Sequence, residues 1–157
     1  MSDGDHVKVS INKSIENYST AVTTKGVHTC PGIMGGVEWN GPAHNPLTRM
    51  LYTPVVDWCG TFTASPDEAV EFALGAVYLG GSYRPDAKKQ GWISAVDAIT
   101  GEPRWRYQSP QPVVAAVTTS AGGVVFGGEL TGHFLVLDAK TGKVLHRFQT
   151  GGPMAAE

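Results

Sequence analysis

The chain has 157 residues, enough for one ordinary domain, and its 41% hydrophobic and 17% charged residues are typical of a folded protein. Twenty Gly and ten Pro are too many for a helical bundle and suit short strands joined by turns. The net charge of −2, without a Lys/Arg cluster, gives no support to a nucleic-acid partner, and no apolar run approaches the roughly 20 residues of a membrane span.

The N-terminal stretch is polar. Residues 1–29 are rich in Ser, Thr and Asn, and the alternating patch V-K-V-S-I over 7–11 predicts an edge strand followed by a loop. The first residues, M-S-D-G-D-H, do not resemble a secretory signal. Either the protein is cytoplasmic or a leader lies outside this chain.

Residues 30–59 alternate turn residues with short strands. Gly35 and Gly36 would let another group approach the backbone closely, and a strand is expected over 37–39. Asn45-Pro46 predicts a turn before a strand over 50–56, whose internal Pro54 indicates an edge or a bulge.

The next stretch contains a helix signal and two further segments. The sequence S-P-D-E over 65–68 has an N-cap, a first-position proline and early acidic residues, which predict one or two helical turns. Residues 76–81 indicate a buried strand. Residues 82–90, with Pro85 and two lysines, indicate a solvent-exposed loop.

The strongest signal is a repeat. Residues 91–105 read G-W-I-S-A-V-D-A-I-T-G-E-P-R-W, and residues 132–146, 41 positions later, read G-H-F-L-V-L-D-A-K-T-G-K-V-L-H. Each copy predicts a strand, an Asp-x-x-Thr-Gly turn and a returning strand. Trp105 ends the first copy and His146 the second. Two more strands, over 113–118 and 123–126, are expected between the copies.

The repeat predicts an all-β fold. A unit of about 40–45 residues built from short strands has the size of one propeller blade. We expect a single domain over 1–157, with 1–29 poorly defined and 30–153 forming three to four four-stranded blades. Because closed propellers use about 4–8 blades, this would be a partial propeller. It would be completed by further blades of a larger protein or by self-association.

These motifs resemble the quinoprotein alcohol dehydrogenases, oxidoreductases whose eight-bladed propellers hold pyrroloquinoline quinone (PQQ). Ala95, Asp97, Thr100, Gly101 and Trp105 match the family's tryptophan-docking motif. The pattern over 112–128 and the segment G-G-V-E-W-N within 35–54 are similar to the family's late blades. The resemblance covers about residues 30–153. It implies that Trp105 is a blade-docking residue.

The resemblance also implies a cofactor-binding pair and a disulfide. Glu38-Trp39 stands where the family presents Asn-Trp to PQQ, so an indole at Trp39 would cover the planar quinone. Glu38 and Val114, which stands where many members have a second Trp, are departures from the pattern. Cys30 and Cys59 match a family disulfide and would imply a periplasmic setting; two buried thiols are the alternative.

The resulting hypothesis is a C-terminal fragment of a PQQ-dependent alcohol dehydrogenase-like quinoprotein. It would contribute part of the cofactor pocket without being catalytically complete, since the family's catalytic Asp and calcium ligands lie in earlier blades. The whole enzyme would use PQQ with calcium and oxidise a small alcohol. Neither PQQ nor calcium is expected to bind to this chain alone. No catalytic or metal-binding residue is assigned here. The alternative is a non-catalytic propeller that serves as a scaffold or binding module.

Overall fold

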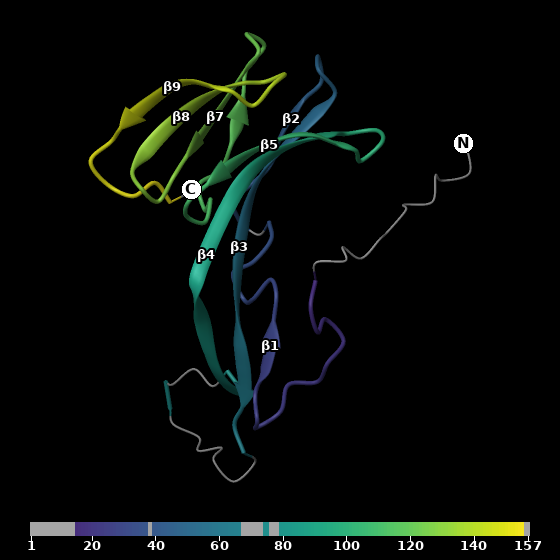
Figure 1. The fold of residues 1–157 in the computed structure, drawn as a ribbon, viewed down its shortest axis with the longest axis vertical. Helices are drawn as coiled ribbons and strands as arrows, with labels where there is room; N and C mark the ends of the chain where they lie inside the picture. The colour runs from purple at the N-terminus through teal and green to yellow at the C-terminus, as the bar shows by residue number, and fades with distance from the viewer. Residues whose placement is uncertain (1–14, 38, 67–73, 76–78, 156–157) are drawn as a thin grey trace.

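The computed structural model describes residues 15–37, 39–66, 74–75 and 79–155 as two antiparallel sheets (Figure 1). The first sheet has the order β1-β3-β4-β5, and β2 also pairs with β3. The second has the order β6-β7-β8-β9. The strands of the first sheet are Val27–Thr29, Ala43–Asn45, Met50–Ala64, Gly81–Asp97 and Pro103–Ser109, and those of the second are Thr118–Thr119, Val124–Gly128, His133–Asp138 and Val144–Gln149. The all-β prediction is therefore confirmed, and the two sheets match propeller blades.

The blade count is smaller than expected, because the described residues form two sheets where three to four blades were predicted. Strands β3 and β4 have 15 and 17 residues, about three times the usual strand length. Their outer halves form an arm that extends away from the second sheet (Figure 1). The length of β3 and β4 takes up residues that the expectation of three to four blades required for further short strands.

The expected loop over 82–90 is wrong, because this segment is the outer half of β4. It pairs with β3 from Gly81 opposite Ala64 to Gln90 opposite Asp57, with a register shift between Trp58 and Gly60. Most of its side chains are exposed or half-exposed, so no alternation of apolar and polar residues marks it as a strand.

Pro54 lies in the middle of β3, where a missing N–H would ordinarily break a ladder. The pairing of β2 with β3 ends at Tyr52, and the pairing of β1 begins at Gly60. Pro54 falls in the interval between them, so β3 is locally an edge strand on that side. The prediction from Pro54 of an edge or a bulge is confirmed.

The two predicted hairpins are confirmed, and their pairing registers correspond. Trp105 lies opposite Ala95 in the first sheet, and His146 lies opposite Val136 in the second; a register shift follows in each case. Asp138 shows why the turn recurs, since its Oδ1 accepts from the backbone N–H groups of Lys140 and Thr141.

The core lies between the two sheets. Its buried side chains include Tyr52 and Ile93 from the first sheet and Val125, Leu135 and Leu137 from the second. Ile93 comes so close to the second sheet that a Cβ on Gly127 would lie 2.7 Å from its Cδ1. The residues over 113–117 were expected to form a strand, but they cross this core as irregular chain, and only Thr118–Thr119 pairs.

Other predictions fall on residues that the structure does not describe. The edge strand over 7–11, most of the helical turn after Ser65 and the first half of the strand over 76–81 lie outside the described ranges. Of the described residues 79–81, only Gly81 belongs to a strand, as the first residue of β4. Within those ranges, no helix is both long and apolar enough to cross a membrane.

Candidate functional site

The segment from Cys30 to Asn40 runs beside β3, and backbone hydrogen bonds join the two at two points. The backbone N–H of Gly32 donates to Trp58 O at 2.8 Å. Gly36 and Val56 exchange two backbone hydrogen bonds of 2.7 and 2.9 Å, with Gly36 at a φ of 93°. A strand was expected over 37–39, but Val37 and Trp39, its two described residues, do not belong to a strand, and the neighbouring bridge pairs Gly36 with Val56.

Asn40 fixes the end of this segment to the core. It is 2% exposed, and its Nδ2 donates to Val113 O at 2.7 Å and to Pro54 O at 3.4 Å. The neighbouring Trp39 is 58% exposed and makes no hydrogen bond or ring contact with another described residue. A firmly anchored backbone thus presents an open indole face. Glu38, the other predicted cofactor contact, lies outside the described residues.

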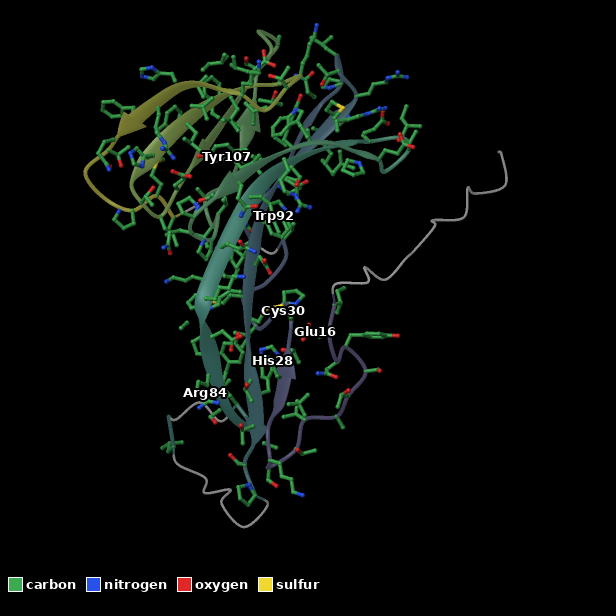
Figure 2. The ribbon with its side chains drawn as sticks, in the orientation of Figure 1. Glu16, His28, Cys30, Arg84, Trp92 and Tyr107 are labelled. Atoms are coloured by element: carbon green, nitrogen blue, oxygen red, sulfur yellow. A yellow bond between two sulfur atoms is a disulfide. The ribbon has the colours of Figure 1, made fainter. Side chains whose placement is uncertain are left out.

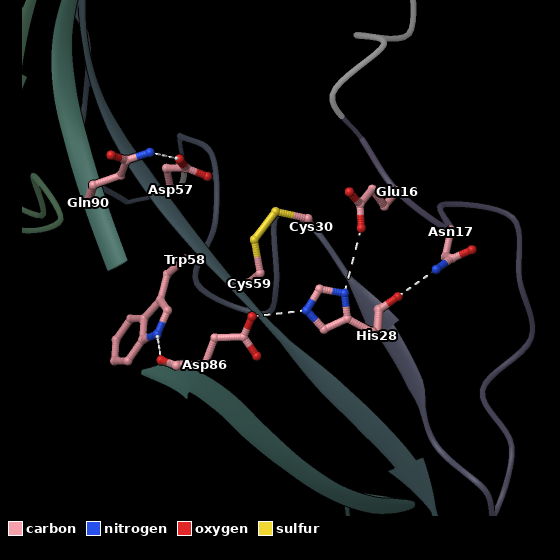
Figure 3. The surroundings of a disulfide bond; sticks show 9 residues. All are labelled: Glu16, Asn17, His28, Cys30, Asp57, Trp58, Cys59, Asp86 and Gln90. Carbon is pink, nitrogen blue, oxygen red and sulfur yellow. Dashed lines mark hydrogen bonds and ion pairs between the residues drawn. A yellow bond between two sulfur atoms is a disulfide. The ribbon is translucent and has the colours of Figure 1, made fainter. Parts of the chain in front are cut away.

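Cys30 and Cys59 form the predicted disulfide, which joins the start of this segment to β3 (Figure 3). Next to it, Trp58 Nε1 donates to Asp86 O at 2.8 Å, and the Lys89 ammonium lies 4.8 Å from the centre of the Trp58 ring. These contacts hold β3 and β4 together where the register shifts.

His28 on β1 forms a second tie in the same region. Its Nε2 lies 3.0 Å from Asp86 Oδ2 on β4, and its Nδ1 lies 3.6 Å from Glu16 Oε2 (Figure 3). The hydrogen bond to Asp86 raises the pKa of His28 above its ordinary value of 6.5, against a smaller effect of desolvation. Figure 2 shows His28 and Arg84 along the arm, whereas Tyr107 lies near the second sheet.

Trp105 lies at the junction of the two sheets. Its Nε1 donates to Ala139 O at 2.9 Å, and the same carbonyl accepts from Tyr52 Oη at 3.2 Å. The indole packs on Gly142, where an added Cβ would come within 2.5 Å of the ring. Trp105 therefore links β5 to the Asp-x-x-Thr-Gly turn of the second sheet, away from Trp39.

The structure also contains a buried charge that no sequence motif indicated. Glu129, which follows β7, is 0% exposed. Its carboxylate accepts from Tyr107 Oη at 2.9 Å, from Arg147 Nη2 at 2.7 Å and from Thr131 Oγ1 at 3.1 Å. These three partners come from β5, from β9 and from the loop after β7, so only the folded arrangement brings them together.

The titration of this cluster reflects both burial and pairing. Burial alone would raise the pKa of Glu129, but the hydrogen bonds from Tyr107 and Thr131 and the charge of Arg147 outweigh it, so the pKa is lowered. Burial first, and then the bond to Glu129, raise the pKa of Tyr107 to about 12. Glu129 is thus a carboxylate that helps hold the sheets together.

Among the described residues, Cys30, Asp57 and Cys59 form the grouping of potential metal ligands. Both sulfur atoms belong to the disulfide, which leaves one carboxylate, and Asp57 Oδ2 already accepts from Gln90 Nε2 at 2.7 Å. This arrangement offers too few oxygen or nitrogen ligands to hold a cation.

Comparison with known proteins identifies the origin of this architecture. The family model PQQ_2, described as outer membrane protein assembly factor BamB, matches residues 61–157, more than half of the chain. The chain belongs to the PQQ quinoprotein alcohol dehydrogenase family. It is 34% identical over 130 residues to a quinoprotein ethanol dehydrogenase of Pseudomonas aeruginosa, a match covering 81% of this chain and 20% of that protein.

Other members agree in sequence and fold. The chain is 39% identical over 128 residues to lupanine 17-hydroxylase [cytochrome c] of a Pseudomonas species, which covers 80% of this chain and 18% of that protein. A europium-containing methanol dehydrogenase matches with a TM-score of 0.75 and 28% identity, over 85% of this chain and 24% of that one. The chain thus spans about a fifth of the length of the curated relatives it matches.

Proposed function

We propose that this chain is the C-terminal part of a PQQ-dependent alcohol dehydrogenase and forms one wall of its cofactor pocket. The observation that carries the proposal is Trp39, a 58% exposed indole beside a buried and hydrogen-bonded Asn40. An indole held on an anchored backbone offers a planar apolar face on which a flat ring can stack in the complete protein. The cofactor would be that ring.

The residues around Trp39 fit a flat ring system. A Cβ added at Gly36 or at Gly41 would meet no atom within 4 Å, so the space over both glycines is open. The disulfide and the Gly36–Val56 bridge fix the backbone that carries the indole. Trp39 would therefore orient the ring by stacking and exclude water from one of its faces.

When bound, PQQ would accept two electrons from an alcohol, with the base and calcium ion supplied by parts of the protein that precede this chain. This chain would be inactive alone. The Cys30–Cys59 disulfide supports a periplasmic location for the whole protein, since such bonds persist in oxidising compartments.

The test is a chimera of the Pseudomonas aeruginosa quinoprotein ethanol dehydrogenase in which residues 30–153 replace the matching segment. We expect PQQ-dependent ethanol oxidation by the chimera. Trp39→Ala should lower this activity at limiting PQQ, whereas Ile99→Ala, which removes a 70% exposed apolar side chain from a distant turn, should leave it unchanged.

A chimera that is folded by circular dichroism but inactive at saturating PQQ would contradict the proposal. If the large graft does not fold, a graft of residues 35–45 alone replaces it, and the same PQQ-dependent activity is measured for the loop that carries Trp39. The second candidate function, a non-catalytic scaffold, is favoured by Val114, which is 8% exposed and packs in the core. A scaffold function predicts that the folded chimera is inactive at saturating PQQ.

A further inference from the structure

A surface cleft lies between the two sheets. It is next to the C-terminal end of β2, whereas Trp39 precedes the N-terminal end of that strand. One wall is the turn after β2 and the start of β3, including Leu47 and Arg49. The other walls are the end of β4, the start of β5 and the turn that follows β8, including Lys140. The cleft is separate from the proposed cofactor wall, because Trp39 precedes β2 and this turn follows it.

The floor of the cleft does not repel an anion. Ala139 lines it, and the carbonyl oxygen of Ala139 already accepts hydrogen bonds from Trp105 Nε1 and Tyr52 Oη. Both lone pairs of that oxygen are therefore engaged.

The walls carry more positive than negative charge. Asp97 is the acidic residue that lines the cleft, and Arg104 Nη2 donates to its Oδ2 at 2.9 Å. The other carboxylate oxygen of Asp97 accepts from the backbone N–H groups of Ile99 and Thr100. Asp97 and Arg104 thus neutralise each other, which leaves Arg49 and Lys140 as the other charged residues that line the cleft. Asp138, which does not line the cleft, also interacts with the charge of Lys140.

These two cations have no side-chain hydrogen bond or ion pair with any residue in the described part of the chain. They come from different sheets, and they stand out in a chain whose net charge is −2. Leu47, 75% exposed, and the half-buried Met50 add apolar surface to the same wall. Two cations beside apolar side chains complement a chain segment in which acidic and apolar residues alternate.

We propose that this cleft binds an acidic segment of a partner protein. Carboxylates of the segment would pair with Arg49 and Lys140, and an apolar residue between them would lie on Leu47 and Met50. Rim charges of this kind steer association and set specificity more than they add affinity, so the interaction would be sensitive to salt.

The test is a titration of the purified chain with a fluorescent, end-capped Glu-Leu-Glu-Leu-Glu peptide, followed by anisotropy. Arg49→Asn suits the φ of 57° at that position, because Asn tolerates left-handed backbone. Arg49→Asn and Lys140→Gln should each weaken binding about 2- to 5-fold, the range of an exposed ion pair. Raising NaCl from about 0.05 to 0.5 M should also weaken it several-fold.

Lys143→Gln is the matched control, because it removes the same charge from the same turn but does not line the cleft. Its affinity for the peptide should equal that of the unchanged chain. The proposal is overturned if no peptide binds at low salt, or if Lys143→Gln weakens binding as much as Lys140→Gln. Displacement of the peptide by equimolar phosphate would also overturn it, since that result identifies a small-anion site.

Discussion

The contact between the two sheets depends on Trp105, and its removal should destabilise the whole chain. Truncation of a buried Trp to Ala costs about 3–5 kcal/mol. Trp105 is only partly buried, and Ala139 O keeps its bond from Tyr52, so we expect the lower end, about 3 kcal/mol. Trp105→Phe keeps an aromatic ring on Gly142 and loses the Nε1 hydrogen bond, which is worth about 1 kcal/mol.

The assay is urea unfolding of the two variants, followed by far-ultraviolet circular dichroism. The expected order of stability is the unchanged chain, then Trp105→Phe, then Trp105→Ala. Ile99→Ala, at an exposed position, serves as the control and should change little. If Trp105→Ala lost less than about 1 kcal/mol, or no more than Trp105→Phe, packing of the indole between the sheets would not be a main stabilising contact.

Three further perturbations test other parts of the structure. Replacing Cys30 and Cys59 by Ser opens a link between positions 29 residues apart and should reduce the free energy of unfolding by about 3–4 kcal/mol in the chain-entropy account; an unchanged urea midpoint would contradict it. Glu129→Gln should destabilise the chain by about 1–3 kcal/mol. It should also lower the pKa of Tyr107 below about 12, as read from its ultraviolet absorbance, although the effect of burial remains; an unmoved titration would show that the carboxylate does not act on this tyrosine. The pKa of His28 is raised in the fold, so its stabilising contribution is complete below 6.5 and is lost as the pH rises through the folded value. His28→Ala should therefore destabilise the chain more at about pH 5 than at pH 8, and equal losses at both pH values would exclude this titration.

The hairpins were predictable because their turns are encoded locally. The side chains of Asp138 and Thr141 accept hydrogen bonds from backbone N–H groups within three residues, and the same residue types recur at Asp97 and Thr100. The family's docking motif then indicated Trp105 as the residue that contacts a neighbouring sheet. The disulfide was predictable from the same resemblance, and its two cysteines lie 4.5 Å apart at Cα.

The arm and the buried charge were not predictable from local pattern. The outer half of β4 exposes both faces, so residues 82–90 lack the alternation that marks a half-buried strand. The apolar run over 113–117 is buried as irregular chain. Because it forms neither a helix nor a strand, its sequence has no hydrophobic periodicity from which its structure could be predicted. Glu129 is buried because Tyr107 and Arg147, 22 and 18 residues away, converge on it.

The most direct test of the proposed role is the dissociation constant of PQQ from the chimera that carries residues 30–153, measured by equilibrium titration with and without Trp39. We expect saturable binding that Trp39→Ala weakens about 5- to 100-fold, the range for loss of one stacked aromatic face, while Trp39→Phe retains most of the affinity. Saturable PQQ binding that is unchanged in Trp39→Ala would contradict the proposal that Trp39 stacks on the cofactor. The exposed indole would then be assigned to a contact with another blade.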